Sequence, residues 1–265
     1  MKVVLTIAGS DCSGGAGIQA DLKTILAHGA YGMSVVTALT AQNTTGVFGV
    51  LKTDAAFIGT QLDAVFRDFR PDAVKIGMIA DAQAVQMISD KLLAYQAGKI
   101  VVDTVLASTS GTRLTGEEAL ACAKEKLYPL ASLLTPNLPE AETLAGIPVT
   151  DKTSMQLAAD RIAGMFGCAV LIKGGHLKGA ADDLLYQDGN YCWLHAPRMH
   201  HPNTHSTGCT LSSAIACNLA EGMRMEDAVY SAKAYVADAI ADGLNLGAGR
   251  GPLNHGCRIF GSTGR

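Results

Sequence analysis

The stretch VVLTIAGSDCSGGAGIQADLKTILAHG, residues 3–29, decides the fold class. Residues 3–7 are apolar and rich in β-branched side chains, which predicts a strand. Apolar side chains then recur at helical spacing up to Gly29, at Ile18, Leu22, Ile25 and Leu26. Because a glycine commonly ends a helix, the stretch is a strand followed directly by a helix, the repeating unit of α/β folds.

The same alternation continues along the chain. Apolar runs predict further strands at residues 34–39, 73–76, 100–105, 132–134 and 169–173. Helical spacing predicts helices around residues 57–66, between the strands at 73–76 and 100–105, and at 208–220 and 225–242. A turn at Asp188-Gly189 predicts a hairpin that pairs residues 182–187 with 191–195. We expect a mostly parallel sheet with helices on both faces.

Composition narrows the class of protein. The chain has 265 residues, of which 48% are hydrophobic and 17% charged, with a net charge of −3. A chain of this kind can form one large core, so we expect a single domain at residues 1–255 and a weakly patterned tail at 256–265. Without a basic stripe we expect no nucleic-acid partner.

Cellular location and redox state follow from short signals. Residues 1–10 lack a basic start and an apolar core, and no apolar run reaches the length of a membrane span. Seven cysteines form no C-x-x-C pair, which favours reduced thiols. We therefore expect a cytoplasmic protein with no membrane partner.

The loop at residues 8–17 joins the first strand to the first helix. Its glycines permit a tight turn and close approach of the backbone to a ligand, although the spacing is neither G-x-G-x-x-G nor a Walker A loop. A glycine-rich turn chosen for geometry alone explains the pattern equally well. Asp11 favours a ligand, because a carboxylate accepts hydrogen bonds from hydroxyl or amino groups.

The segment HSTGCT, residues 205–210, precedes the apolar positions of a helix. Backbone N–H groups at a helix N-terminus bind anions, and the helix dipole lowers the pKa of a thiol in the first turn. Cys209 is thus a candidate base for a substrate alcohol, while neighbouring N–H groups hold a phosphoryl group. The alternative is a small buried cysteine packed against the sheet.

Polar side chains also occur where other strands end. Asn137 and Glu140 are three residues apart, which suits magnesium or phosphate binding and, equally, a helix capping box. Asp103 lies in the apolar strand predicted at 100–105, and Lys173 lies at the end of the one predicted at 169–173. A buried charge needs a partner, so both should face the ligand end of the sheet. Gln42 offers the donor and acceptor that an aminopyrimidine needs, although it also suits a turn.

Nine short motifs together resemble the hydroxymethylpyrimidine/phosphomethylpyrimidine kinases of thiamin biosynthesis, a branch of the ribokinase-like superfamily. They span nearly the whole chain and are AGSD (8–11), GGAGIQADLKT (14–24), TALTAQNT (37–44), KIGM (75–78), TPNLPEA (135–141), KGGH (173–176), NTH (203–205), TGCTLS (207–212) and GPLNH (251–255). The resemblance implies a three-layer α/β/α fold, usually a homodimer. It also implies that ATP and Mg²⁺ are used to phosphorylate the alcohol and then its monophosphate.

The resemblance also implies roles for individual residues. Catalysis falls to the anion hole and its neighbours, Ser206, Thr207, Gly208, Cys209 and Lys173. Pyrimidine binding falls to Gly9, Asp11, Gln42, Met78 and Val105. Metal binding falls to Asp103, Asn137 and Glu140, and nucleotide binding to Asn137, Lys173, Thr207 and Lys233.

One departure from the family pattern affects the anion hole, because Ser206 stands where glycine is usual. A side chain there restricts the backbone and narrows the hole, which puts the second phosphorylation in question. Three alternatives stay open: a pyridoxal kinase of the same superfamily, a non-catalytic pyrimidine-binding protein, and a dinucleotide-dependent oxidoreductase. The last lacks both the fingerprint spacing and an acidic residue closing a second strand.

Overall fold

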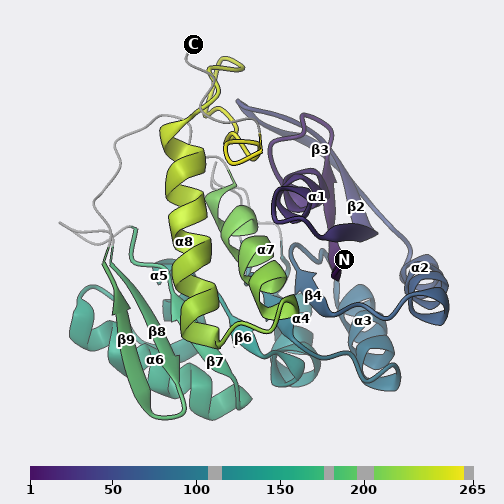
Figure 1. The fold of residues 1–265 in the computed structure, drawn as a ribbon. Coiled ribbons are helices and arrows are strands. Elements are labelled where there is room, and N and C mark those ends of the chain that lie inside the picture. The colour runs from purple at the N-terminus through teal and green to yellow at the C-terminus, as the bar shows by residue number, and fades with distance from the viewer. Residues whose placement is uncertain (107–114, 176–181, 196–205, 260–265) are drawn as a thin grey trace.

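The computed structural model describes residues 1–106, 115–175, 182–195 and 206–259. The nine strands within these ranges form one sheet in the order β3-β2-β1-β4-β5-β6-β7-β8-β9 (Figure 1). Their bounds are β1 Val3–Asp11, β2 Tyr31–Asn43, β3 Gly46–Lys52, β4 Ala73–Ile76, β5 Ile100–Val102, β6 Leu133–Leu134, β7 Ala169–Ile172, β8 Asp183–Gln187 and β9 Asn190–Leu194.

The six strands from β2 to β7 in this order are parallel, and antiparallel strands lie at both edges. Ile7 of β1 pairs with Val35 of β2 on one side and with Ile76 of β4 on the other. At the edges, β3 is antiparallel to β2, and β8 and β9 form an antiparallel hairpin on β7. Parallel strands carry their carboxyl ends at one edge of a sheet, which is where α/β proteins bind ligands.

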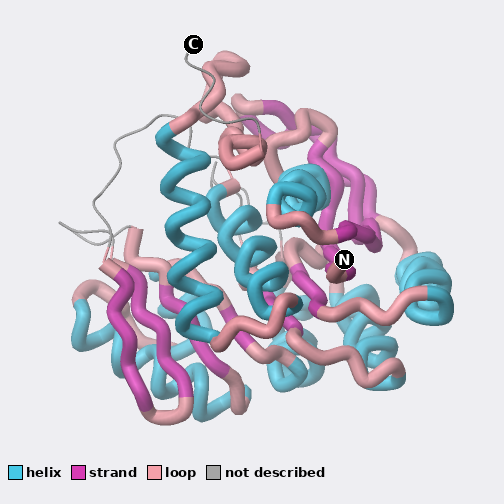
Figure 2. The backbone as a smooth tube through the Cα atoms, viewed as in Figure 1, coloured by secondary structure: helices cyan, strands magenta, loops and turns pink. Residues whose placement is uncertain are grey.

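Helices cover both faces of the sheet (Figure 2). One face carries α1 Gly17–Ala27, α7 Thr207–Ala220 and α8 Met225–Ala241. The other carries α2 Ala55–Asp68, α3 Ala82–Ala94, α4 Glu117–Cys122, the short η1 Ala123–Leu127 and η2 Tyr128–Leu130, α5 Leu138–Ala145 and α6 Lys152–Phe166. None of the helices in the described ranges has both the length and the apolar character that crossing a membrane requires.

The core has two halves because neighbouring residues of a strand point to opposite faces. Leu5 and Ile7 of β1 pack with α2 and α3, whereas Val4 packs with α1, α7 and α8. The central strands are therefore buried on both sides, which is why they are apolar without a break.

Most of the predicted elements are confirmed, with three differences. The strand predicted at 100–105 ends at Val102, so Asp103 begins the loop after it. The strand predicted at 34–39 is the middle of the longer β2. No prediction covered β3, α4, η1, η2 or α6. The apolar run of β3 is interrupted by Gly49, and as an edge strand it leaves Phe48, Val50 and Leu51 exposed.

The start of the predicted tail packs on α8. Residues 255–259 form a turn, and the guanidinium of Arg258 lies 2.7 Å from Oδ2 of Asp238. The Tyr235 hydroxyl donates a hydrogen bond of 2.7 Å to the carbonyl of His255. Residues 260–265 lie outside the described part of the chain.

Candidate active site

A cavity of about 290 Å³ lies at the carboxyl end of the parallel strands. The ends of β1 and β2 and the loops after β1, β4, β5, β6 and β7 contribute to its lining, together with the first turns of α5 and α7. Every residue predicted for the site except Lys233 lines this cavity, namely Gly9, Asp11, Gln42, Met78, Asp103, Val105, Asn137, Glu140, Lys173, Ser206, Thr207, Gly208 and Cys209. Residues that are far apart in the chain thus meet at one place.

The loop between β1 and α1 is organised by the carboxylate of Asp11. One oxygen accepts hydrogen bonds from the N–H and the hydroxyl of Ser13, at 2.9 and 2.8 Å. The other accepts from the N–H groups of Gly15 and Ala16, at 3.1 and 2.8 Å. A carboxylate has about four lone-pair directions, and the loop uses all of them. Asp11 therefore shapes the loop, and its direct contact with a ligand stays a prediction.

Two glycines of this loop lie close to their surroundings, and the backbone geometry requires a glycine at Gly17. Gly17 has a φ of +56°, and a methyl group on it would lie 2.2 Å from the carbonyl oxygen of Gly9. A methyl group on Gly9 would lie 2.6 Å from Cε of Met78. The geometric explanation of the glycines is thus correct, and the loop they form lines the cavity as well.

The rim beside this loop combines one amide with apolar side chains. Gln42 is half-buried near the end of β2, and its Oε1 accepts a hydrogen bond of 3.2 Å from the Thr40 hydroxyl. Met78 and Val105 are half-buried and line the same cavity. The rim therefore offers a flat ring both an amide and a hydrophobic contact.

An ion pair lies deeper, between the loops after β5 and β7. Asp103 is only 3% exposed; it accepts hydrogen bonds from Nζ of Lys173 at 2.9 Å and from the Thr135 hydroxyl at 3.2 Å. Burial alone would lower the pKa of Lys173, but the carboxylates of Asp103 and Glu140 outweigh it and raise that pKa. Lys173 is thus a fixed positive charge at neutral pH.

Asn137 and Glu140 form the predicted capping box and still line the cavity. The N–H of Glu140 donates to Oδ1 of Asn137 at 2.9 Å, and the N–H of Asn137 donates to Oε2 of Glu140 at 2.8 Å. Burial raises the pKa of Glu140, and Lys173 acts in the opposite direction. The capping interpretation is confirmed, and the two oxygen-bearing side chains remain at the cavity wall.

The start of α7 is a helix N-terminus without a side-chain cap. The N-cap is Ser206, whose side chain makes no capping hydrogen bond, so the N–H groups of the first turn are not taken up by it. Gly208 abuts the ion pair, because a methyl group there would lie 3.2 Å from Oδ2 of Asp103 and 3.3 Å from Nζ of Lys173. The N-terminus of α7 and the Asp103–Lys173 ion pair therefore meet at one point of the cavity.

Ser206 carries a local strain. Its φ of 67° and ψ of 24° lie in the left-handed region, which costs a residue with a side chain roughly 1–2 kcal/mol. Its hydroxyl is buried and has no hydrogen-bond partner within the described part of the chain. These are the backbone angles that the glycine usual at this position adopts freely.

Cys209 is half-buried and lines the cavity, so it is not sealed in the core. The predicted lowering of its pKa is wrong for the ligand-free chain. Burial raises the pKa of the thiol, Asp21 and Asp103 add to that increase, and Lys75 is the main opposing charge. Removal from water thus outweighs the helix position that favours a thiolate.

Two lysines differ from what the sequence indicated. Lys233 does not line the cavity; it forms an ion pair with Asp183, whose other carboxylate oxygen accepts a hydrogen bond of 2.8 Å from the N–H of Gly174. Lys75, which had no role beyond the motif that contains it, contributes to the cavity floor. The signal for Lys75 was a lysine inside a short apolar strand, since burying a charge is costly.

The sequence matches the phosphomethylpyrimidine kinase family model over residues 11–254. It is 43% identical over 260 residues to the hydroxymethylpyrimidine/phosphomethylpyrimidine kinase of Haemophilus influenzae, covering 96% of this chain and 97% of that protein. It is 48% identical to the thiamine biosynthesis bifunctional protein ThiED of Geobacter sulfurreducens over 95% of this chain, which spans 52% of that relative's length.

Solved structures give the same result. A phosphomethylpyrimidine kinase from Clostridium difficile 630 is similar with a TM-score of 0.82 and 44% identity, covering 91% of this chain and 100% of that one. A pyridoxal kinase from Staphylococcus aureus, in complex with AMP-PCP and pyridoxal, has a TM-score of 0.88 and 33% identity, covering 98% and 96%. The predicted ribokinase-like α/β fold is therefore confirmed, and the chain belongs to the phosphomethylpyrimidine kinase family.

Proposed function

We propose that this kinase transfers the γ-phosphoryl group of ATP to the hydroxymethyl group of 4-amino-5-hydroxymethyl-2-methylpyrimidine, and then phosphorylates the monophosphate, in thiamin biosynthesis. The observation that carries the proposal is the convergence of the uncapped start of α7, Lys173 and Cys209 on one cavity whose rim holds Gln42. Two of the relatives above support it, since one is named as a hydroxymethylpyrimidine/phosphomethylpyrimidine kinase and the other as a phosphomethylpyrimidine kinase.

The phosphate end lies at the start of α7. The N–H groups of Thr207, Gly208 and Cys209 belong to the first helical turn, where backbone N–H groups and the helix dipole favour negative charge. Lys173 adds a positive charge at the same point. Donors fixed before the reaction stabilise the charge that develops on the transferring phosphoryl group. The relative's complex with AMP-PCP supports a nucleotide here.

Asp103, Asn137 and Glu140 present oxygen atoms that fit Mg²⁺. The described residues contain no cluster of three or more His, Cys, Asp or Glu side chains that would hold a metal alone. Magnesium in kinases takes one or two carboxylates and completes its shell with phosphates and water, so the two carboxylates and the amide suffice. Bound there, the ion would neutralise charge on the phosphates. Lys233 would support this end indirectly, through Asp183 and the N–H of Gly174.

Cys209 is the base in this proposal. Its sulfur accepts the proton of the acceptor hydroxyl while the oxygen–phosphorus bond forms and the bond from phosphorus to ADP breaks. Because burial raises the pKa of this thiol, the thiolate fraction grows as the pH rises above neutrality. The rate should therefore increase with pH over the range in which the thiol loses its proton.

The pyrimidine end lies at the rim. The amide of Gln42 can pair with the ring nitrogen and the exocyclic amine, and Met78 and Val105 pack against the ring face. Gly9 lets the tip of Met78 approach the backbone at this end, because a methyl group on Gly9 would lie 2.6 Å from Cε of Met78. Asp11 holds the loop that closes this end.

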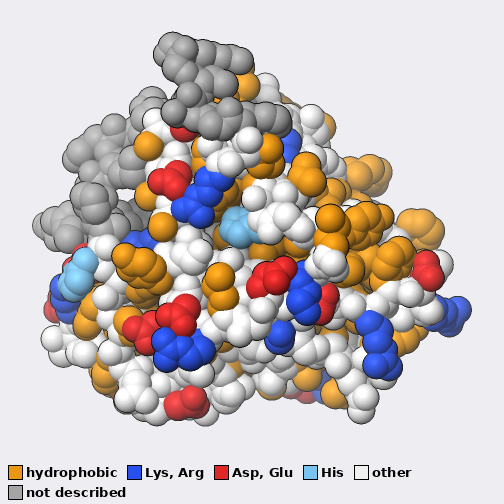
Figure 3. Space-filling view, in the orientation of Figure 1, with side chains coloured by type: hydrophobic (Ala, Val, Ile, Leu, Met, Phe, Trp, Pro, Cys, Tyr) orange, Lys and Arg blue, Asp and Glu red, His pale blue; other side chains and the backbone are white. Residues whose placement is uncertain are grey.

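We also propose that the protein is a cytoplasmic homodimer whose partner copy covers β3. Large apolar side chains are exposed on β2, β3 and α2, and they gather on one side of the molecule in Figure 3. They include Leu39, Phe48, Leu51 and Phe57. A contiguous apolar patch of this kind marks an interface. Analytical ultracentrifugation of wild type and Phe48→Glu tests it; a wild-type monomer would contradict it.

One assay tests the function. Purified protein is mixed with ATP, Mg²⁺ and one acceptor, either the hydroxymethylpyrimidine, its monophosphate or pyridoxal, and ADP release is followed. We expect turnover with both pyrimidines. Faster turnover with pyridoxal would instead support the pyridoxal kinase alternative, which the similarity to the Staphylococcus aureus enzyme favours. Nucleotide binding without ADP release from any acceptor would support a non-catalytic protein.

A further inference from the structure

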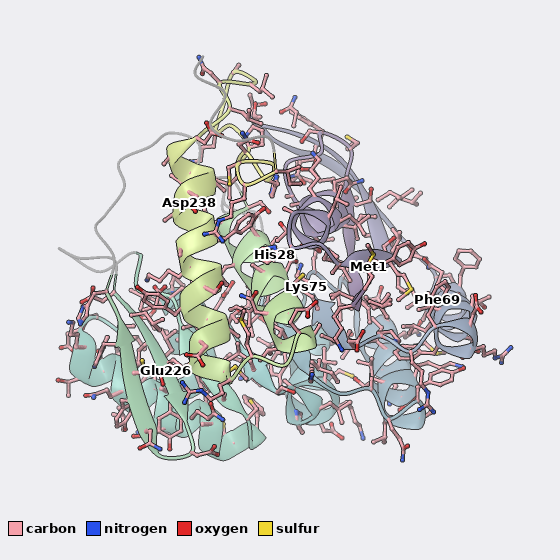
Figure 4. All side chains as sticks on the ribbon, in the orientation of Figure 1. Met1, His28, Phe69, Lys75, Glu226 and Asp238 are labelled. Atoms are coloured by element: carbon pink, nitrogen blue, oxygen red, sulfur yellow. The ribbon has the colours of Figure 1, made fainter. Side chains whose placement is uncertain are left out.

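A second ion pair, between Lys75 and Asp21, lies beside the cavity, and the mechanism proposed above does not use it. Lys75 of β4 and Asp21 of α1 are both fully buried, and Nζ of Lys75 lies 2.9 and 2.8 Å from the two carboxylate oxygens. Figure 4 shows Lys75 in the interior, between α7 and the sheet. Taking two charges out of water costs several kcal/mol per ion, so stability alone is a poor reason for this pair.

The carboxylate of Asp21 is held from three elements. Oδ2 accepts a hydrogen bond of 2.6 Å from the Thr6 hydroxyl of β1, and Oδ1 accepts one of 2.8 Å from the Ser213 hydroxyl of α7. Both donors are fully buried. Asp21 is therefore a fixed anchor, and the ammonium of Lys75 has a fixed position beside it.

The anchor lies next to the base of the proposed mechanism. Ser213 follows Cys209 by four residues in α7, and residues at this spacing lie on the same face of a helix one turn apart. Lys75 and Cys209 both contribute to the lining of the cavity. The ammonium of Lys75 is therefore bound to a carboxylate that also contacts α7 one turn after Cys209, and both Lys75 and Cys209 line the cavity.

The charges that face Cys209 come from four elements. Lys75 on β4 and Lys173 after β7 favour the thiolate, whereas Asp21 on α1 and Asp103 after β5 disfavour it. Lys173 forms an ion pair of 2.9 Å with Asp103, and the proposed function assigns it to phosphate binding. Within the described ranges Lys75 is the other cation that faces the thiol, and it is the largest influence that opposes burial of the thiol.

We propose that Lys75 is a positioning residue for phosphoryl transfer: anchored by Asp21, it holds a positive charge against the sulfur of Cys209 and stabilises the thiolate that takes the proton of the acceptor. This proposal rests on the role of Cys209 in the proposed function. The proton moves from the acceptor hydroxyl to the sulfur, and Lys75 keeps its own protons. Burial would lower the pKa of Lys75, but Asp21 more than compensates and raises it.

The test measures the thiol directly and needs no turnover. Wild type, Lys75→Met and Asp21→Asn are treated with iodoacetamide over a range of pH, and alkylation of each cysteine is quantified by peptide mass spectrometry. Exposed Cys12 in the same sample is the internal control. We expect Lys75→Met to lower the alkylation rate of Cys209 at pH 8 by about tenfold or more, the equivalent of one pKa unit. Asp21→Asn should lower it too, because Lys75 then loses its anchor and the carboxylate that keeps it charged despite burial.

Slower alkylation in both variants separates this role from general damage, which would expose the half-buried thiol and raise its alkylation rate. The rising limb of kcat/KM against pH should move with the alkylation midpoint. An unchanged rate at Cys209 relative to Cys12 in Lys75→Met would overturn the proposal. If that variant does not fold, as judged by circular dichroism, the double variant Asp21→Asn with Lys75→Met buries no unpaired charge. It should still show slower alkylation, and an unchanged rate there would also overturn the proposal.

Failure of the proposed function gives a different pattern. If wild type releases no ADP with any pyrimidine but the alkylation rates shift as expected, the function is wrong and the coupling of Lys75 to Cys209 stands. If ADP release is normal and the rates do not shift, Lys75 has no such role.

Discussion

The two ends of the cavity are built on opposite principles. At the loop between β1 and α1, the carboxylate of Asp11 accepts four hydrogen bonds from its own loop. At the start of α7, the side chain of Ser206 makes no capping hydrogen bond and the backbone has left-handed angles. The buried Ser206 hydroxyl has no hydrogen-bond partner among the described residues. One end uses its polar groups to hold its own shape, and the other keeps them available.

This difference indicates what each end does. A loop with satisfied hydrogen bonds is rigid and selects a ligand by shape. Uncapped N–H groups beside fixed positive charge stabilise a negative charge that appears only during the reaction. Substitutions at the loop should therefore change stability and acceptor affinity, and substitutions at α7 should change the rate of transfer.

The largest expected effect is at α7. Cys209→Ala should lower kcat/KM for the hydroxymethylpyrimidine by about 10² to 10⁴, the usual contribution of a positioned base, with little change in nucleotide binding. ADP release and calorimetric titration with AMP-PCP measure the two quantities. Cys217→Ala is the control, since Cys217 is buried on the same helix and does not line the cavity. Near-normal turnover of Cys209→Ala would remove the base from the mechanism.

At the loop the largest effect should be on folding. Gly17→Ala combines a positive φ with a contact of 2.2 Å to the carbonyl oxygen of Gly9, so the free energy of unfolding should fall by more than about 3 kcal/mol. Urea unfolding measures it. Gly164→Ala in α6 is the control, because nothing lies within 4 Å of the new methyl group. It should stabilise the helix by about 0.5–1 kcal/mol. Equal effects at the two sites would contradict the strain at Gly17.

Acid should lower the free energy of unfolding through His255, which contacts α7. Burial lowers the pKa of His255 to about 4, whereas an unfolded histidine has a pKa of about 6.5. Between these values the unfolded chain binds more protons, so stability is complete above pH 6.5 and is lost as the pH falls to 4, by about 3 kcal/mol. Nε2 of His255 lies 3.1 Å from the Thr210 hydroxyl of α7. Urea unfolding of wild type and His255→Asn at several pH values checks this prediction. If the free energy of unfolding depends on pH in the same way in both proteins, His255 is not the cause of the loss.

Gln42→Ala tests the recognition at the rim. Loss of the amide should raise KM for the hydroxymethylpyrimidine by about tenfold, the equivalent of one or two hydrogen bonds, and leave KM for ATP unchanged. Asn43→Ala, which alters the exposed neighbour at the end of β2, is the control. Equal increases for both substrates would place Gln42 outside acceptor recognition.

The smallest expected effect is a gain in stability at Ser206. Ser206→Gly removes left-handed strain and a buried hydroxyl without a described partner, so the free energy of unfolding should rise by about 1 kcal/mol. The reciprocal change Gly146→Ser, at a left-handed helix C-cap with open space around it, should cost about as much. A lower stability of Ser206→Gly would show that the serine is favourable in its position.

The sequence was most informative where burial is two-sided. The apolar runs at β1, β4 and β7 and the Asp188-Gly189 turn placed their strands correctly, and the motifs placed thirteen predicted residues around one cavity. Two features could not be predicted because they depend on neighbours distant in sequence, namely the pKa of Cys209 and the pairing of Lys233 with Asp183. The hydrogen bonds that occupy Asp11 come from Ser13, Gly15 and Ala16, and they depend on the backbone conformation of the loop.

The hydrogen bond from Ser213 to Asp21 joins residues 192 positions apart, and this has a consequence for synthesis. At about 5–20 residues per second, a ribosome takes about 10–40 s between these two residues. During that interval Asp21 and Lys75 exist without α7, the helix that later covers them. A nascent chain must therefore keep this half of the sheet from aggregating until its last two helices arrive, and truncation before Ser213 should yield insoluble protein.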